Sequence, residues 1–311
     1  MGARQLGLPQ RARAANLPSR VTIWEVGARD GLQNESAIVP VEVKAEFLDR
    51  LAAAGLPVLE ATSFVSPKWV PQLADAEDLL KRLGRYPDVR YPVLVPNARG
   101  LQRAVDAGCT DIAIFASATE TFAQRNLNSG LEAQFAMFEE VVSGAAGMNV
   151  RAYMSMCFGD PWEGPVPVEQ VVQVGKRLLR LGCWQLSLGD TIGVATTGHV
   201  EQVLAAFLEA GVGPERLAVH FHDTYGQALA NTVAALRFGV STVDSSAGGL
   251  GGCPYAESAT GNLATEDLVW LLEGLGIEHG VDLDALVGTS TWMAERLGRP
   301  SPSRVVKALA G

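Results

Sequence analysis

The sequence predicts an α/β protein with a (β/α)8 (TIM) barrel and a short C-terminal helical extension. Eight short runs rich in β-branched and aliphatic residues alternate with longer segments of helical periodicity, as parallel strands with crossover helices require. Several helical segments end in glycine, which supplies the left-handed turn into the next strand. These glycines are Gly55, Gly108, Gly182, Gly211 and Gly239.

The predicted strands recur at intervals that fit one βα unit each. They cover residues 21–26, 57–62, 91–95, 111–117, 150–156, 184–189, 217–222 and 241–247. Helical segments stand between them, for example residues 41–55, 131–147 and 168–182. We therefore expect a single catalytic barrel domain over residues 21–311, including the C-terminal tail, preceded by a flexible arm over residues 1–20.

Composition narrows the class of function. A hydrophobic content of 48% with 19% charged residues is typical of a globular chain, and no apolar run reaches the ~20 residues of a membrane span. A net charge of -9 argues against a nucleic-acid partner, and an anionic substrate would need a local cationic pocket. The four cysteines form no CxxC pair, which indicates a reduced, intracellular chain.

The N-terminal arm bears on the compartment. Residues 1–20 contain four arginines and no acidic residue, a composition similar to that of a mitochondrial transit peptide. The single serine and the lack of an amphipathic stripe favour a disordered arm instead. We expect a cytoplasmic protein, with the mitochondrial matrix as the alternative.

Polar residues gather just where the predicted strands end, at the face that carries the active site of a (β/α)8 barrel. The candidates are Arg29, Asp30, Gln33, Glu60, Tyr153, Ser155, Ser187, Asp190, His220, His222, Cys253 and Asn262.

The pair His220 and His222 predicts a metal site. Alternate residues of a strand face the same side, so both imidazoles can face the interior of the barrel. Asp30 and the amide oxygen of Asn262 are the nearest plausible further ligands, and this mixed nitrogen and oxygen set favours Mg²⁺ or Mn²⁺. Two structural alternatives remain: hydrogen-bonded core histidines, and Asn262 as a helix N-cap.

The glycine-rich segment before Cys253 allows two interpretations. Gly248, Gly249, Gly251 and Gly252 could form a loop whose backbone holds a phosphate, or a mobile loop that carries a reactive thiol. A dinucleotide-binding site is a weak alternative, because the segment follows the last strand and lacks the GxGxxG spacing.

Several motifs together resemble the hydroxymethylglutaryl-CoA lyase family. They are VTIWEVGARDGLQNE, EATSFVSPKWVPQ, SLGDTIGV, VHFHDTYGQALAN and GGLGGCPYA, followed by GNLATEDLVWLLEGLGI, and the match runs in register from about Val21 to Leu283. The resemblance implies a metal-dependent (β/α)8 enzyme that cleaves 3-hydroxy-3-methylglutaryl-CoA into acetyl-CoA and acetoacetate. It also implies an acyl-CoA substrate and a homodimer.

The resemblance also implies roles for individual residues. Asp30, His220, His222 and Asn262 would hold the metal, Arg29 would face the thioester oxygen, and Cys253 would act as general acid or base. Asp190 or Glu60 would relay protons. The substrate contacts would come from Arg29, Gln33, Tyr153, Ser187 and Glu266.

The chain departs from the family pattern in the loop after GGCPYA. It reads ESATGN, with Glu257 and Ser258 where a glycine is common. A lyase for a longer 3-hydroxy-3-alkylglutaryl-CoA is therefore one alternative. An acyl-CoA condensing synthase of the same barrel group is another, although only a short tail follows Leu283.

Overall fold

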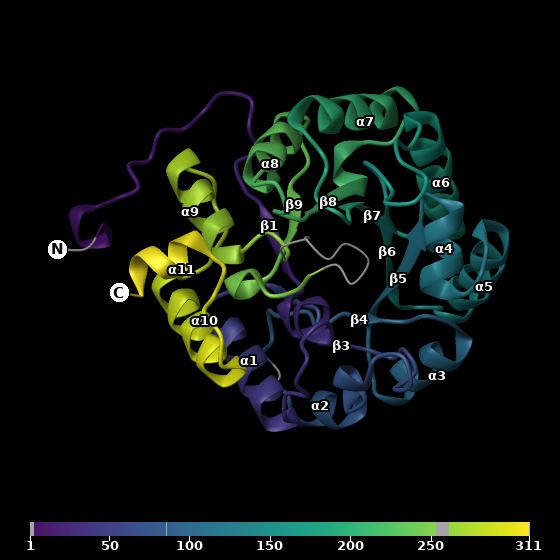
Figure 1. Ribbon diagram of the computed structural model, residues 1–311, viewed down its shortest axis with the longest axis horizontal. Helices are drawn as coiled ribbons and strands as arrows, with labels where there is room; N and C mark the ends of the chain where they lie inside the picture. Colours follow the sequence, from purple (N-terminus) through teal and green to yellow (C-terminus); the bar gives the residue numbers. More distant parts are fainter. Residues whose placement is uncertain (1–2, 85, 253–260, 311) are drawn as a thin grey trace.

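The computed structural model describes residues 3–84, 86–252 and 261–310 and is built around one curled sheet of parallel strands (Figure 1). The order in the sheet is β2-β1-β9-β8-β7-β6-β5-β4-β3. The strands are β1 (Thr22–Glu25), β2 (Val58–Leu59), β3 (Thr62–Ser63), β4 (Val93–Leu94), β5 (Asp111–Ser117), β6 (Asn149–Ser155), β7 (Gln185–Asp190), β8 (Leu217–Phe221) and β9 (Thr242–Ser245).

The sheet closes into a barrel through the second predicted strand. Only Glu60 and Ala61 separate β2 from β3, which stand at the two ends of the strand order. The Glu60 amide donates to the Glu25 carbonyl oxygen on β1 at 2.8 Å, and the Ala61 amide donates to the Pro92 carbonyl oxygen before β4 at 2.9 Å. One extended segment therefore joins both edges, and the predicted eight-stranded barrel is confirmed.

A ring of helices surrounds the strands (Figure 1). The helices are α1 (Val41–Ala53), α2 (Ala76–Arg82), α3 (Ala98–Asp106), α4 (Glu120–Leu127), α5 (Leu131–Gly144), α6 (Val168–Leu181), α7 (Thr197–Glu209), α8 (Ala228–Arg237), α9 (Thr265–Leu275), α10 (Leu283–Leu297) and α11 (Arg304–Leu309). All five predicted helix-ending glycines have positive φ. At Gly55, where φ is +92°, a Cβ atom would lie 2.3 Å from the Gly280 carbonyl oxygen, so only glycine fits.

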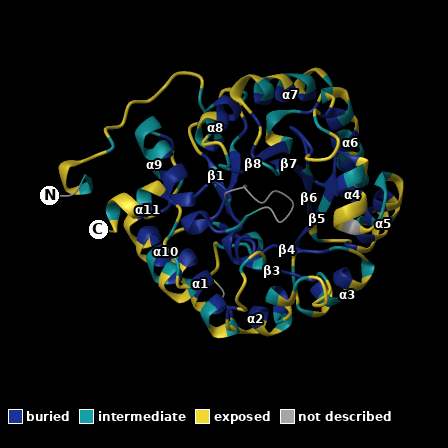
Figure 2. Ribbon diagram, in the orientation of Figure 1, coloured by how far each residue is buried: buried dark blue, intermediate teal, exposed yellow. Residues whose placement is uncertain are grey.

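The interior of the barrel and the space between sheet and helices have different compositions. Strand residues such as Ile23, Ile114 and Phe221 belong to the main apolar core that packs against the helices. Figure 2 shows the strands buried and exposure confined largely to the outer helix faces and loops. The interior of the barrel instead holds polar groups, among them Arg151 of β6 and Asp244 of β9, which pair across it. Side chains that can form hydrogen bonds therefore lie at the centre of the barrel, and the apolar side chains lie between the strands and the helices.

Both chain ends lie on the same side of the barrel, near α9 to α11 (Figure 1). Helices α10 and α11 form the predicted C-terminal extension and pack on α1 and α9 respectively. In the N-terminal segment, Arg4 pairs with Glu273, and the Ala12 amide donates to the Gly274 carbonyl oxygen at 2.8 Å. The flexibility of the arm stays a prediction. In the described part of the chain, no helix is both long and apolar enough to span a bilayer.

Five predicted strands end one or two residues earlier than the sequence pattern indicates, and two of these ends bear on the site. The seventh ends at Phe221, because His222 pairs instead with Asn262 in an isolated antiparallel bridge. The eighth ends at Ser245, and the short helical turn η5 (Ala247–Gly249) follows. Positive φ angles at Gly248 and Gly249 are incompatible with an extended strand. Both early ends place loop backbone at the mouth of the barrel.

Candidate active site

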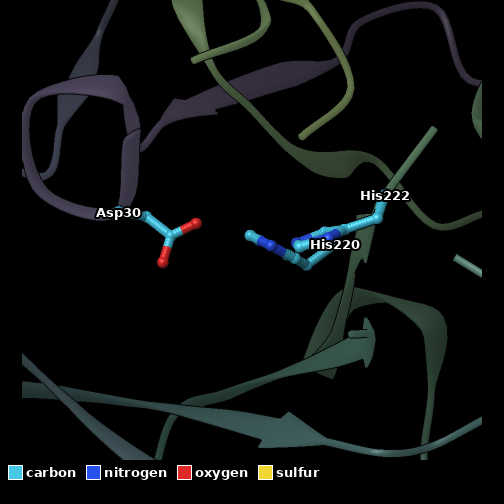
Figure 3. A group of neighbouring side chains, drawn as sticks. All are labelled: Asp30, His220 and His222. Carbon is cyan, nitrogen blue, oxygen red and sulfur yellow. The ribbon is translucent and has the colours of Figure 1, made fainter. Parts of the chain in front are cut away.

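Asp30, His220 and His222 come together at the carboxyl end of the barrel. Asp30 lies in the single π-helical turn η2 (Gly27–Gly31) after β1, whereas His220 is in β8 and His222 directly follows it. One potential ligand atom from each residue lies within 4.8 Å of those of the other two. Figure 3 shows the Asp30 carboxylate and the two imidazoles facing one another from opposite sides.

Asn262 joins this group from the segment after the glycine-rich loop. Its Nδ2 donates to Asp30 Oδ2 at 2.8 Å and to the Leu250 carbonyl oxygen at 3.0 Å. Its Oδ1 is buried and has no hydrogen-bond partner among the described residues, and the same holds for His222 Nδ1. Unpartnered buried polar atoms are costly, so the four side chains form a set of nitrogen and oxygen donors that fits a divalent cation.

The charge states of Asp30 and His222 also suit a cation, whereas Asp244, acting against burial, raises the pKa of His220. Burial opposes ionisation of Asp30, but Arg29 and the two histidines outweigh it and lower the Asp30 pKa to about 2. Burial and the neighbouring His220 lower the pKa of His222 to about 4. At neutral pH Asp30 is therefore a carboxylate and His222 is neutral, which are the forms that bind metals.

Arg29 connects Asp30 to a second carboxylate, that of Glu60. Its Nη1 donates to Asp30 Oδ1 at 2.6 Å and its Nη2 to Glu60 Oε2 at 2.8 Å, while its Nε has no partner in the described structure. The Tyr153 hydroxyl donates to the same Glu60 oxygen at 2.8 Å. Burial raises the Glu60 pKa, and Arg29 opposes that rise. A buried cation thus stands at the mouth of the barrel, where negative charge on a substrate could be stabilised.

Comparison with known proteins identifies the family. A family model described as HMGL-like matches residues 20–293, which is most of the chain. This chain belongs to the HMGL-like family. It is 51% identical to the mitochondrial hydroxymethylglutaryl-CoA lyase of Rattus norvegicus, over 99% of this chain and 95% of that protein. The resemblance that the motifs indicated is thereby confirmed.

Two further relatives extend this result. The HMGL-like chain is 53% identical to the cytoplasmic 3-hydroxy-3-methylglutaryl-CoA lyase of Danio rerio, over 94% of this chain and 88% of that protein. It also superposes on an HMG-CoA lyase of Acinetobacter baumannii in complex with coenzyme A and 3-methylmalate, with a TM-score of 0.90 and 36% identity. That match covers 96% of this chain and 97% of the other.

The sequence analysis missed two residues of the site in this HMGL-like protein, Arg151 and Asp244. Asp244 Oδ2 lies 3.4 Å from His220 Nδ1 and accepts a hydrogen bond from the Ser187 hydroxyl at 2.8 Å. Arg151 pairs with Asp244 across the interior of the barrel. The sequence does contain a signal for both residues. Arg151 is two residues before Tyr153 and so faces the same side of its strand, and Asp244 is the charged residue within the predicted strand STVDSSA.

Other predicted site residues order the loops around the centre. Asp190 accepts hydrogen bonds from the Val194 and Ala195 amides at 2.9 and 3.0 Å, and burial raises its pKa to about 6. Glu266 accepts from the Gly248 amide at 2.9 Å and from the Ser290 hydroxyl, and burial raises its pKa to about 8. In the described structure, neither carboxylate hydrogen-bonds to Asp30, His220, His222 or Asn262.

The remaining predicted site residues are less well defined by contacts. Gln33 is half-buried just beyond η2, close in sequence to Arg29 and Asp30. Cys253, Glu257 and Ser258 lie outside the described residues.

Proposed function

We propose that this chain is a 3-hydroxy-3-methylglutaryl-CoA lyase that produces acetyl-CoA and acetoacetate. The main observation in favour of this proposal is the group of Asp30, His220 and His222, which lies beside Arg29 at the carboxyl end of the barrel. The names of the rat and zebrafish relatives support this activity, and the CoA complex of a structural neighbour supports an acyl-CoA substrate.

Four side chains are proposed to hold the cofactor, Mg²⁺ or Mn²⁺. They are Asp30, His220, His222 and Asn262. Ligand atoms of the first three lie within 4.8 Å of one another, and Asn262 Oδ1 is buried without a partner in the described structure, which favours a divalent cation. When bound, such an ion supplies Lewis acidity that lowers the pKa of the tertiary hydroxyl of the substrate.

Arg29 is proposed to stabilise the enolate of acetyl-CoA. As the bond between C2 and C3 of the substrate breaks, negative charge develops on the thioester oxygen. Asp30 and Glu60 hold the guanidinium in place beforehand, so the donors need no reorganisation during the reaction. Tyr153 contributes to the same arrangement through its hydrogen bond to Glu60.

Proton transfer is assigned to Cys253, with Glu60 and Asp190 as relays. A thiol is mostly protonated at neutral pH, which suits protonation of the enolate carbon; action as a base needs a lowered pKa. Glu60 has the better support as a relay, because it lies between Arg29 and Tyr153, whereas Asp190 is engaged by its own loop. Gln33, Ser187 and Glu266 stay proposed substrate contacts.

The direct test is an assay of the purified protein after removal of metal with a chelator. Acetoacetate release from 3-hydroxy-3-methylglutaryl-CoA is expected to vanish on chelation and to return with Mg²⁺ or Mn²⁺. A chain-extended analogue, assayed in parallel, tests whether the loop containing Glu257 and Ser258 selects a longer substrate. The reverse reaction, from acetyl-CoA and a keto acid, tests the synthase alternative. Absence of cleavage of both thioesters at every metal concentration contradicts the proposal.

Cys253→Ala tests the proton-transfer assignment. We expect normal Mn²⁺ binding and loss of most turnover, because the thiol donates or accepts a proton but holds no metal. Cys109→Ala is the matched control, since it removes a thiol that packs against the core. Unchanged turnover of Cys253→Ala removes the thiol from the mechanism.

Assembly and location complete the proposal. We propose a homodimer, which light scattering of the purified protein tests, with a monomer as the contradicting result. We propose a cytoplasmic location, although relatives carry both cytoplasmic and mitochondrial names. Fractionation of the source cells distinguishes the two compartments.

A further inference from the structure

A buried polar network crosses the interior of the barrel beneath the proposed metal site. Arg151 Nη1 and Nη2 donate to the two carboxylate oxygens of Asp244 at 3.1 and 2.6 Å, and both side chains are fully buried. Arg151 Nε also donates to Gln185 Oε1 at 3.1 Å. Ser187 donates its hydroxyl to Asp244 Oδ2 at 2.8 Å. The Asp244 carboxylate is therefore held from two strands besides its own.

The same carboxylate oxygen faces the proposed metal ligand His220. Asp244 Oδ2 lies 3.4 Å from His220 Nδ1, and that nitrogen has no hydrogen-bond partner elsewhere in the described chain. With Nδ1 directed at Asp244, Nε2 is the nitrogen left for a ligand. The Asp30 carboxylate stands opposite the imidazole (Figure 3).

We propose that Asp244 is a positioning residue that fixes the ring orientation and tautomer of His220. Arg151 and Ser187 in turn fix Asp244. The proposal rests on the proposed metal-dependent function. A carboxylate that accepts from the non-ligating nitrogen keeps the proton on that nitrogen and leaves the other free for a cation. The 3.4 Å contact is longer than a charge-assisted hydrogen bond of about 2.7–2.9 Å, and we expect it to shorten when a cation binds.

The rigidity of the carboxylate explains why the orientation would hold. A bidentate contact from a planar guanidinium fixes both oxygens in one plane, which a single hydrogen bond does not. The Arg151 guanidinium is itself stacked 4.1 Å from the centre of the Trp24 ring. The chain of contacts runs from Trp24 through Arg151 and Asp244 to His220.

The test must separate orientation of His220 from stability of the barrel. Asp244→Asn alone leaves Arg151 buried without its partner and can prevent folding. The double variant R151M/D244N removes both charges at once. We expect it to fold and to bind Mn²⁺ about 10- to 100-fold more weakly than the parent in the absence of substrate, measured by calorimetry or electron paramagnetic resonance. In ¹⁵N spectra of metal-free protein, the preference of His220 for the Nδ1-protonated tautomer should be lost.

An ion pair outside the interior of the barrel supplies the control. Lys44 of α1 donates from Nζ to Asp75 Oδ1 at 2.7 Å, and the lysine side chain is buried. K44M/D75N should bind Mn²⁺ like the parent. Equal Mn²⁺ affinity in the parent and R151M/D244N, or equal weakening in both double variants, overturns the positioning role. If the parent itself binds no Mn²⁺, the proposed metal-dependent function fails with it.

Discussion

The two ends of this barrel use buried charge differently. At the amino end, one oxygen of Asp111 accepts from Arg90 and from Asn149 Nδ2, and the other accepts from the Thr110 hydroxyl. At the carboxyl end, polar atoms of the site are buried without partners in the described structure. They are Arg29 Nε, Glu60 Oε1, His220 Nδ1, His222 Nδ1 and Asn262 Oδ1.

This difference separates a structural ion pair from a binding site. A buried polar group that lacks a partner costs free energy, so a chain retains a cluster of them only where something else is gained. At the carboxyl end the proposed gain is the binding of a cation and a substrate, whereas the satisfied carboxylate of Asp111 serves stability. The following predictions test this contrast, from the largest expected effect to the smallest.

Asp30→Asn should have the largest effect. The amide keeps the size of the side chain and removes a charged ligand, so we expect turnover to fall by more than the about 100-fold typical when only an outer partner of a metal ligand is lost. Thermal stability should change little, because Arg29 keeps its ion pair with Glu60. Turnover and melting temperature of the purified variant check both statements. Retention of near-parental turnover contradicts the assignment of Asp30.

Gly251→Ala should weaken metal binding by displacing the side chain of Asn262. Gly251 has φ +115°, and a Cβ atom there would lie 2.5 Å from Asn262 Nδ2, so the amide must move. We expect about 10-fold weaker Mn²⁺ binding, measured by titration. Gly108→Ala is the control: it has φ +74° but no atom within 4 Å of the added Cβ, so it should lower stability without changing Mn²⁺ affinity. Equal Mn²⁺ affinities would indicate that Asn262 is not a ligand.

Asp111→Asn should have the opposite effects to Asp30→Asn, with lower stability and unchanged activity. The neutral side chain loses its ionic contact with Arg90, and we expect the free energy of unfolding to fall by about 1–3 kcal/mol. Specific activity below the melting temperature should equal that of the parent. Chemical denaturation and the lyase assay together check this prediction, and a loss of activity in the folded variant would erase the distinction between the two ends.

Glu25→Gln should produce the smallest change, in the pH dependence of the melting temperature. Burial raises the Glu25 pKa to about 7, against hydrogen bonds from Thr265 and from the Ala247 and Gly27 amides. The raised value means that its contribution to stability is present below the unfolded pKa of 4.5 and is lost as pH rises through 7. Between pH 5 and pH 8, the melting temperature of the parent should therefore fall further than that of Glu25→Gln. Identical pH profiles contradict this account.

Much of the fold was predictable because its signals are local. The helix-ending glycines need positive φ irrespective of distant contacts, and the alternation of strand and helix periods follows from nearby residues. Closure of the barrel at Glu60 and Ala61 is a non-local result, since neighbours on both sides come from distant parts of the chain. No local pattern marks the point where one strand bonds to two edges.

The same division holds for the site. The sequence by itself determined the barrel, its catalytic end and the pairing of Asp30 with the HxH motif, because strand parity and strand ends are properties of the chain order. Only the tertiary structure decided that His222 leaves the strand to pair with Asn262, and that Asp244 lies behind His220. The first contact joins segments outside the named strands, and the second depends on the register of the neighbouring strands β8 and β9, which sets His220 beside Asp244. Neither is a property of chain order alone.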